Sequence, residues 1–300
     1  MDPIRVVVRR GNVVEAVHDV HAVAVQDGAV IADAGDAMLV TLLRSSAKPF
    51  QALPLARARD DLSELDLAIA SASHLASEEQ LEAVRGLLAK APAEEDALEL
   101  GTIGEGYGPT KLHHNCSGKH AGMLALCRAK GWTSEGYHLA DHPVQRSCLE
   151  VIAAAADADP DELPVAIDGC AVPTFALPLE RMALMFSRLE TIDGGARIAT
   201  AMRAHPDLIR GPRAADSLLM REVDGFTAKG GAEGLMCATG PDGLGLALKV
   251  EDGNTRAVRP ALAELLRRLG FETAELGVVR LENSLGEPVG EVVAEGLQSG

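Results

Sequence analysis

The segment that best indicates the fold of this chain is residues 44–51, with the sequence Arg44-Ser45-Ser46-Ala47-Lys48-Pro49-Phe50-Gln51. Upstream, valine-rich segments within residues 4–43 predict short strands, and the Asp27-Gly28 pair between two of them is typical of a hairpin turn. Downstream, apolar residues recur at helical spacing, and a serine followed by a proline in the first turns is typical of a helix start. We therefore expect the strands of a sheet to be followed directly by a helix whose first turn contains Ser45 and Lys48.

The rest of the chain mixes predicted strands and helices, which indicates an α/β fold. Further strands are expected at residues 67–72, 165–167 and 244–250, and helices at 117–129, 143–156 and 257–269. The clearest candidate for a domain boundary is Asp193-Gly194-Gly195, but predicted strands lie on both sides of it. We therefore expect one intertwined catalytic unit over residues 4–296, without a separate linker domain. Two lobes within this unit are also compatible with the pattern.

The composition excludes several classes of protein. The 300 residues include 28 Lys and Arg against 44 Asp and Glu, for a net charge of −16, and aromatic residues make up only 3%. A surface this acidic repels phosphate backbones, and scarce aromatics weaken base stacking, so nucleic acid is not expected as a partner. No apolar run approaches the ~20 residues that a membrane helix needs, so no membrane partner is expected either.

Cysteine usage and the N-terminus indicate the compartment. The five cysteines are an odd number spread between Cys116 and Cys237, which favours a reducing compartment over a secreted, disulfide-linked scaffold. The first residues, Met1-Asp2-Pro3-Ile4-Arg5, lack the features of a signal peptide. We expect a cytoplasmic protein.

Ser45 and Lys48 are the first candidates for catalysis. Residues at i and i+3 share one face of a helix, so the lysine amine can reach the serine hydroxyl. A neutral lysine beside a serine can act as its base in acyl transfer, and the start of a helix favours a developing oxyanion. Ser46 points elsewhere and is the weaker nucleophile. The alternative is an N-cap serine next to a solvated lysine.

A second cluster, His113-His114-Asn115-Cys116-Ser117-Gly118-Lys119-His120, leads into an apolar helix. Three histidines and a cysteine suggest a metal, although the Cys-x-x-Cys pairs of structural zinc sites are missing. Lysine is a rare metal ligand because it must bind deprotonated. A capped helix start with solvated histidines, or a packed cysteine, explains the same residues without a site.

Two further segments carry chemistry at the ends of predicted strands. Asp168-Gly169-Cys170 places an acid and a thiol after the strand at 165–167, where many α/β sites form; a tight turn with a buried cysteine is the alternative. Lys249 lies inside an apolar strand before the acidic turn 251–253. A buried lysine is often functional, whereas an edge strand with this lysine facing water is the simpler account.

Taken together, six segments resemble one family in their order along the chain. They are Arg44-Ser45-Ser46-Ala47-Lys48-Pro49, Ala72-Ser73-His74, Asn115-Cys116-Ser117-Gly118-Lys119-His120, Gly136-Tyr137-His138-Leu139-Ala140-Asp141-His142-Pro143, Asp168-Gly169-Cys170 and Lys249-Val250-Glu251-Asp252-Gly253. This order resembles that of the rhizobial-type, class 3 L-asparaginases of the asparaginase II family, over roughly residues 5 to 270. The flank at 111–114 departs from the family pattern, and the chain is shorter than its typical members.

The resemblance implies hydrolysis of the side-chain amide of L-asparagine to aspartate and ammonia. It also implies a sandwich of sheet and helices like that of serine β-lactamases and glutaminases, usually assembled as a homodimer. By motif, Ser45 and Lys48 match one Ser-Lys pair, and Ser73 and Lys249 match a second.

The remaining implied residues surround those pairs. The resemblance assigns a zinc site to Cys116, Lys119 and Cys170, and candidate substrate contacts to Arg44, His120 and Asp168. Two other functions stay open. One is a glutaminase or β-lactamase-like hydrolase, which a substrate profile would distinguish. The other is a zinc-binding relative without catalysis, against which the presence of both serines and all the motif lysines argues.

Overall fold

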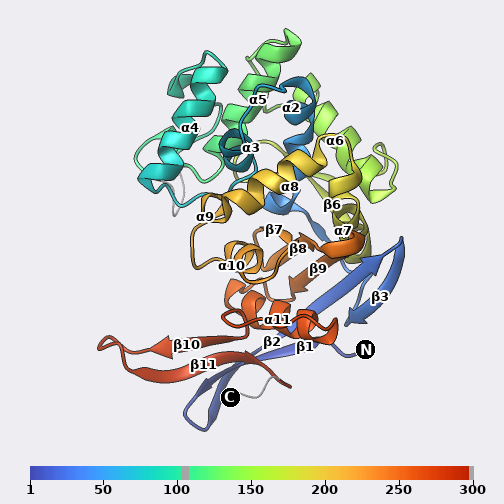
Figure 1. The fold of residues 1–300 in the computed structure, drawn as a ribbon, viewed down its shortest axis with the longest axis vertical. Helices are drawn as coiled ribbons and strands as arrows, with labels where there is room; N and C mark the ends of the chain where they lie inside the picture. Colours follow the sequence, from blue (N-terminus) through green and yellow to red (C-terminus); the bar gives the residue numbers. More distant parts are fainter. Residues whose placement is uncertain (103–107, 297–300) are drawn as a thin grey trace.

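The computed structural model describes residues 1–102 and 108–296 as a mixed α/β fold built on one large antiparallel sheet (Figure 1). The strands follow the order β10-β11-β1-β2-β9-β8-β7, and β3 pairs with the far part of β2. Their bounds are β1 Ile4–Arg10, β2 Val13–Gln26, β3 Ala29–Ala34, β7 Thr227–Gly230, β8 Leu235–Thr239, β9 Gly245–Val250, β10 Val278–Glu282 and β11 Pro288–Ala294. A small second sheet has the order β4-β6-β5, with bounds β4 Val40–Leu42, β5 Val165–Ile167 and β6 Pro173–Pro178.

The helices pack against the large sheet and on one another. Helix α7 lies on β2, β8 and β9, and α11 lies on β1, β9 and β11. Most of the others gather into a helical layer above the sheet in Figure 1. The bounds are α1 Lys48–Gln51, α2 Leu53–Ala58, α3 Glu64–Ala70, α4 Glu78–Lys90, α5 Ser117–Lys130, α6 Pro143–Ala156, α7 Leu179–Ser187, α8 Gly195–Ala204, α9 Pro206–Ile209, α10 Ala215–Glu222 and α11 Val258–Arg268. Within the described residues, none of these helices is long and apolar enough to cross a membrane.

The hairpin expected near the N-terminus is confirmed. Strands β2 and β3 are joined at Asp27 and Gly28, which have φ values of 52° and 78°. Positive φ at both central residues is what a two-residue hairpin turn of type I′ requires. The expected α/β class, with a sheet packed against helices, is confirmed as well.

Residues 67–72 are not the strand that their apolar run suggested. They lie mostly in α3, which begins after Ser63. The Ser63 hydroxyl accepts from the Asp66 amide and the Asp66 carboxylate accepts from the Ser63 amide, which is a capping box. A short apolar run does not separate a buried strand from a buried helix, and this cap is the local signal that does.

The switch from sheet to helix at residues 44–51 positions the candidate site. After β4, Arg44–Ala47 form a 3-10 helix that continues into α1, with Pro49 in its first turn. Helix α5 starts close to α3, because Gly118 has no side chain; a Cβ there would lie 2.2 Å from the Ile69 carbonyl oxygen. The starts of α1 and α5 and the end of α3 therefore meet in the interior.

Candidate functional site

Lys48 and Ser73 form the centre of the candidate site. The Lys48 amine donates to Ser73 Oγ at 2.9 Å, and also to the carbonyl oxygens of Ala72 at 2.5 Å and Asn115 at 3.4 Å. Lys48 is 1% exposed and Ser73 is 2% exposed. The chain positions Ser73 by a bond from its amide to the Ile209 carbonyl at 2.7 Å. A lysine and a serine from two distant segments are thus held in direct contact away from water.

Burial favours the neutral form of the Lys48 amine. Removal from water lowers the pKa of Lys48, against the opposing effect of the nearby Cys116, and the like charge of Lys119 lowers it further. A neutral amine in hydrogen-bond contact with a hydroxyl is the arrangement of a general base. The contact can therefore accept or pass a proton.

Ser45 lies one turn before this contact. It belongs to the 3-10 helix at residues 44–47, its carbonyl accepts the Lys48 amide, and its side chain is partly exposed. Ser46 is fully buried, and its hydroxyl donates to the Leu43 carbonyl at 2.6 Å. Of the two serines, only Ser45 is open to a substrate.

Cys116, Lys119 and Cys170 converge beside Lys48. Lys119 Nζ lies 3.0 Å from Cys170 Sγ, and the Cys116 thiol is hydrogen-bonded to Cys170. That bond and the charge of Lys119 hold the pKa of Cys170 well below its ordinary value, although burial opposes them. Burial alone would lower the pKa of Lys119, but Cys170 and Cys116 raise it above its ordinary value. The cluster is thus poised to hold a thiolate.

The donor atoms of this cluster suit zinc. Two sulfurs and one nitrogen match the preferences of Zn²⁺, and a site with three protein ligands leaves a fourth position open. Lys119 is a ligand only when it is neutral. Across residues 1–102 and 108–296, no group of three His, Cys, Asp or Glu side chains is placed to hold a metal ion. The set that the motifs imply therefore depends on Lys119 as its third donor.

Arg44 and Asp168 close the other side of the site. Arg44 Nε donates to Asp168 Oδ1 at 2.7 Å, and the Arg44 amide donates to Thr174 Oγ1 at 3.0 Å. Burial would raise the pKa of Asp168, but Lys119 and the hydrogen bond from Arg44 bring it below its ordinary value. Arg44 has a φ of 47°, a left-handed conformation that costs energy in a residue other than glycine. A cation and an anion are thus held side by side at the edge of the Lys119 cluster.

Comparison with known proteins decides the family. The model of a single family, L-asparaginase II, matches residues 6–294. The chain belongs to the L-asparaginase II family. The resemblance inferred from the six motifs is therefore confirmed. Membership in the asparaginase II family supports an amidohydrolase that acts on an amino-acid substrate.

Two solved structures are similar to this asparaginase II chain. A crystal structure of Mglu in its native form in the presence of 4.3 M NaCl is 16% identical, with a TM-score of 0.50, over 88% of this chain and 66% of that one. Another, described as a structure analysis of Mglu, is 16% identical with a TM-score of 0.49, over 86% of this chain and 69% of that one. No curated protein sequence matches this asparaginase II chain. The first likeness shows a shared fold.

His120, expected to contact substrate, lies inside the asparaginase II fold. It is fully buried in α5, and its Nδ1 lies 2.8 Å from the Tyr137 hydroxyl. Its Nε2 is buried without a hydrogen-bond partner among the described residues. Burial, together with the charge of Lys119, keeps the pKa of His120 well below its ordinary value. The His120 ring, next to Lys119 in α5, is thus neutral and has one nitrogen without a hydrogen-bond partner among the described residues.

Lys249 is not brought to Ser73. Its amine donates to the carbonyl of Val250, the next residue of β9, and its charged neighbours are Glu233, Asp252 and Glu251. Burial lowers the pKa of Lys249 against the effect of these acids. Ser73 is instead held by Lys48. In this structure the two motif pairs do not form two separate Ser-Lys contacts.

Lys229 is a candidate that the motifs did not identify. It is fully buried in β7, donates to the Gly230 carbonyl at 2.7 Å and lies 3.8 Å from Asp216. Burial lowers its pKa to about 7 against the effect of Asp216, and Lys48 is close enough to lower it further. The sequence does contain a signal, because Thr227-Ala228-Lys229 leads into Gly230-Gly231, a lysine in a short segment that ends in glycines.

Proposed function

We propose that this protein is an L-asparagine amidohydrolase that releases aspartate and ammonia by Ser-Lys catalysis. The observation that carries the proposal is the buried Lys48 amine, 2.9 Å from Ser73 Oγ and one turn after the accessible Ser45. Family membership supports the amide and the amino-acid substrate. The residue pattern supports a serine nucleophile with a lysine base.

In the proposed first step, Ser45 Oγ attacks the carbonyl carbon of the asparagine side chain. Neutral Lys48 takes the hydroxyl proton, and the protonated amine becomes the source of the proton that the leaving nitrogen needs. Collapse of the tetrahedral intermediate breaks the C–N bond, releases ammonia and leaves an ester on Ser45. Water then attacks the ester, gives up a proton to the same base and yields aspartate and free Ser45.

Ser73 and a second lysine would carry the proton to the leaving nitrogen. The hydrogen bond that Ser73 Oγ accepts from the Lys48 amine supports this role. Lys229 supports the role of second lysine, because it is fully buried, has a pKa near neutrality and lies close to Lys48. Lys249, which the motifs favour, is the alternative holder of that role.

Substrate recognition is assigned to side chains around the Lys48–Ser73 pair. Arg44 would face the α-carboxylate and Asp168 the α-ammonium, since charge-assisted hydrogen bonds give the strongest recognition. His120 would support the side of the site that binds the amino-acid head of the substrate. Zinc, held by Cys116, Lys119 and Cys170, would supply a positive charge that orients the amino-acid head. We further propose that residues 4–296 act as one catalytic unit in a cytoplasmic homodimer.

The decisive assay compares the wild type with Ser45→Ala, measuring ammonia release from L-asparagine and L-glutamine and ring opening of a β-lactam. Asparagine is expected to be the best substrate, and Ser45→Ala is expected to be inactive. Ser46→Ala is the matched control, because Ser46 is the adjacent serine and its hydroxyl is bonded to a carbonyl inside the protein. Full activity of Ser45→Ala would overturn the nucleophile, and preference for glutamine or the β-lactam would overturn the substrate.

Metal analysis tests the zinc site separately. Cys170→Ala is expected to lose bound zinc, whereas Cys127→Ala, a buried cysteine elsewhere in α5, is expected to retain it. Equal zinc content in both variants would contradict the assignment.

A further inference from the structure

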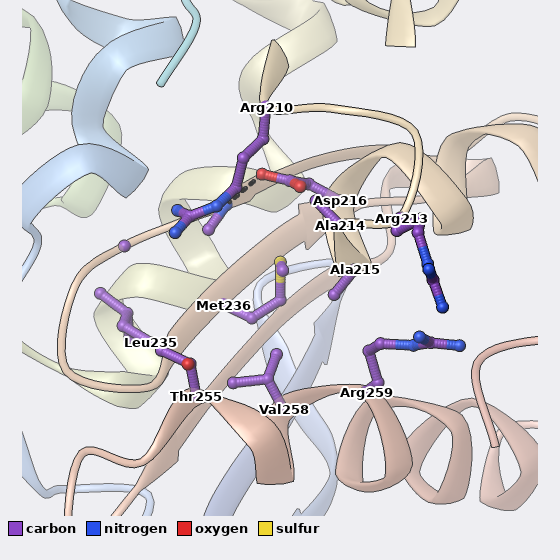
Figure 2. A pocket seen from close by; sticks show the side chains of 12 residues that line it. Arg210, Arg213, Ala214, Ala215, Asp216, Leu235, Met236, Thr255, Val258 and Arg259 are labelled. Carbon is purple, nitrogen blue, oxygen red and sulfur yellow. Dashed lines mark hydrogen bonds between the residues drawn. The ribbon is translucent and has the colours of Figure 1, made fainter. Parts of the chain in front are cut away.

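A cavity lies between α10, the β7–β8 turn and the start of α11. It has a volume of about 190 Å³, and Arg210, Arg213, Asp216, Thr255 and Arg259 are among its lining residues (Figure 2). A water molecule occupies roughly 30 Å³ in the liquid, so the cavity accommodates a small organic molecule rather than one or two waters. None of the catalytic residues proposed above lines it.

The charge of this cavity is opposite to that of the molecule. Three arginines line it in a protein with a net charge of −16. None of these three arginines forms an ion pair shorter than 4 Å within the described residues, whereas many other arginines do. Asp216 also lines the cavity, but it is engaged by Lys229 and by the Gly230 amide at 3.2 Å. The three arginines of the lining therefore have no close ion-pair partner within the described residues, although Glu222 and Glu275 are near enough to Arg259 to affect its charge.

Two arginines are held close together at one end. The charge of Arg213 lowers the pKa of Arg259, adding to burial, while Glu222 and Glu275 oppose both. Arg259 donates to the Glu275 carbonyl, and its Nε is buried without a hydrogen-bond partner among the described residues. An unsatisfied buried guanidinium nitrogen beside a like charge is costly unless an acceptor is supplied. A bound anion would supply that acceptor.

Two helices point their N-termini at the same space. Ala214 and Ala215 at the start of α10, and Val258 and Arg259 at the start of α11, line the cavity. Helix α10 has no side-chain cap at its N-terminus, whereas α11 continues from a 3-10 turn at residues 255–257 that the Asn254 side chain caps. The positive dipole end of α10 therefore adds to the field of the arginines and favours an anion.

The arrangement of the arginines indicates the shape of the anion. Figure 2 shows Arg210 on one side of the cavity and Arg213 and Arg259 together on the other. A compact oxyanion such as phosphate would meet only one end, whereas a ligand with two separated carboxylates meets both. Arginine is also the side chain best suited to bind a carboxylate through two parallel hydrogen bonds.

We propose that this cavity is a binding site for a short dicarboxylate, with one carboxylate at Arg213 and Arg259 and the other at Arg210. The site adjoins the catalytic centre, because Gly230 in the lining follows Lys229, and Arg210 follows Ile209, whose carbonyl holds Ser73. L-aspartate is the dicarboxylate that fits this position, an identification that rests on the proposed function. L-asparagine has only one carboxylate and satisfies only one end.

Titration calorimetry on the full-length protein tests the proposal with succinate, L-aspartate, L-asparagine and inorganic phosphate as probes. Succinate is expected to bind more tightly than phosphate, and L-aspartate more tightly than L-asparagine. In Arg213→Met/Arg259→Met, the Kd for succinate is expected to rise about tenfold or more, since each lost charge-assisted bond contributes more than ~1.4 kcal/mol. Arg280→Met removes an exposed arginine outside the cavity and is expected to bind as the wild type does.

Binding of succinate that is absent, or equal in the double variant and the wild type, would overturn the site. Phosphate binding tighter than succinate would overturn the two-ended ligand. Succinate binding does not depend on amide hydrolysis, so these results are separate from the ammonia assay. Circular dichroism of each variant distinguishes a lost site from a lost fold.

Discussion

Lys229 and Lys249 belong to the same sheet but lie in different surroundings. The strand register aligns Lys229 with Cys237 and Cys237 with Ala247, so Lys249, two residues further along β9, is on the same face. Lys229 is fully buried near Lys48 and Asp216, whereas Lys249 is 8% exposed and surrounded by the acids of a surface turn. Two lysines with similar positions in an apolar strand thus differ in what their amines meet.

This difference teaches that burial of a lysine does not by itself identify a catalytic group. Burial lowers the pKa of both amines. The neighbours distinguish them, because Lys229 lies in an interior that already holds the Lys48 amine, while Lys249 is near Glu251 and Asp252, whose side chains are 66% and 51% exposed. Exposed acids stabilise the charged form, in which a lysine is no base.

The largest effect is expected from Ser73→Ala, which removes the hydroxyl that accepts a hydrogen bond from the Lys48 amine. Loss of a group in the proton path is expected to lower kcat/KM for asparagine by about 100-fold or more. Steady-state ammonia release measures it. Ser71→Ala is the matched control, because Ser71 is also fully buried but its hydroxyl donates only to the Leu67 carbonyl. Equal losses in the two variants would indicate that Ser73 only supports the fold.

A smaller effect is expected in the pH dependence of stability. The pKa of Lys229 is lowered from 10.5 to about 7 in the folded state. Between these values the unfolded chain binds a proton that the folded chain does not, so the free energy of unfolding from this group rises with pH and levels off below pH 7. Lys229→Met removes this contribution. Urea unfolding across that range measures it as the difference between wild type and variant.

The control for the pH series is Lys130→Met, which removes a lysine from the exposed end of α5. Its difference from the wild type is expected to stay flat over the same range. A flat difference for Lys229→Met as well would show that the Lys229 amine is charged in the folded protein at neutral pH.

The smallest effect is expected from Lys249→Met on stability. Methionine keeps most of the aliphatic stem, and the acids near the amine include two exposed ones, so the change in the free energy of unfolding is expected to stay below about 1 kcal/mol. Thermal unfolding at pH 7 measures it. A loss of several kcal/mol would show that the Lys249 amine anchors the end of β9.

Local signals in the sequence predicted much of the fold. The Asp27-Gly28 turn and the helices at 117–129 and 143–156 follow from turn residues and helical spacing, which act over a few residues. The segment at 67–72 was assigned to a strand because its apolar run is short, and the cap at Ser63 that decides for a helix lies before it.

The sequence predicts a set of candidate site residues but not the contacts between them. Motifs identified Lys48, Ser73, Cys116 and Cys170, yet the partners of these side chains come from segments far apart in the chain. Lys48 contacts Ser73 across 25 positions. Lys229 was not predicted, because a lysine before two glycines is a weak signal until β7 is placed beside the helices. Such pairings depend on tertiary packing, which spacing along the chain does not encode.

One measurement tests the central claim most directly: kcat/KM for ammonia release from L-asparagine by Lys229→Met and Lys249→Met, purified and assayed side by side. If Lys229 completes the site with Lys48 and Ser73, Lys229→Met is expected to lose about 100-fold or more, and Lys249→Met is expected to stay within about threefold of the wild type. The reverse pattern, an active Lys229→Met and an inactive Lys249→Met, would contradict the account.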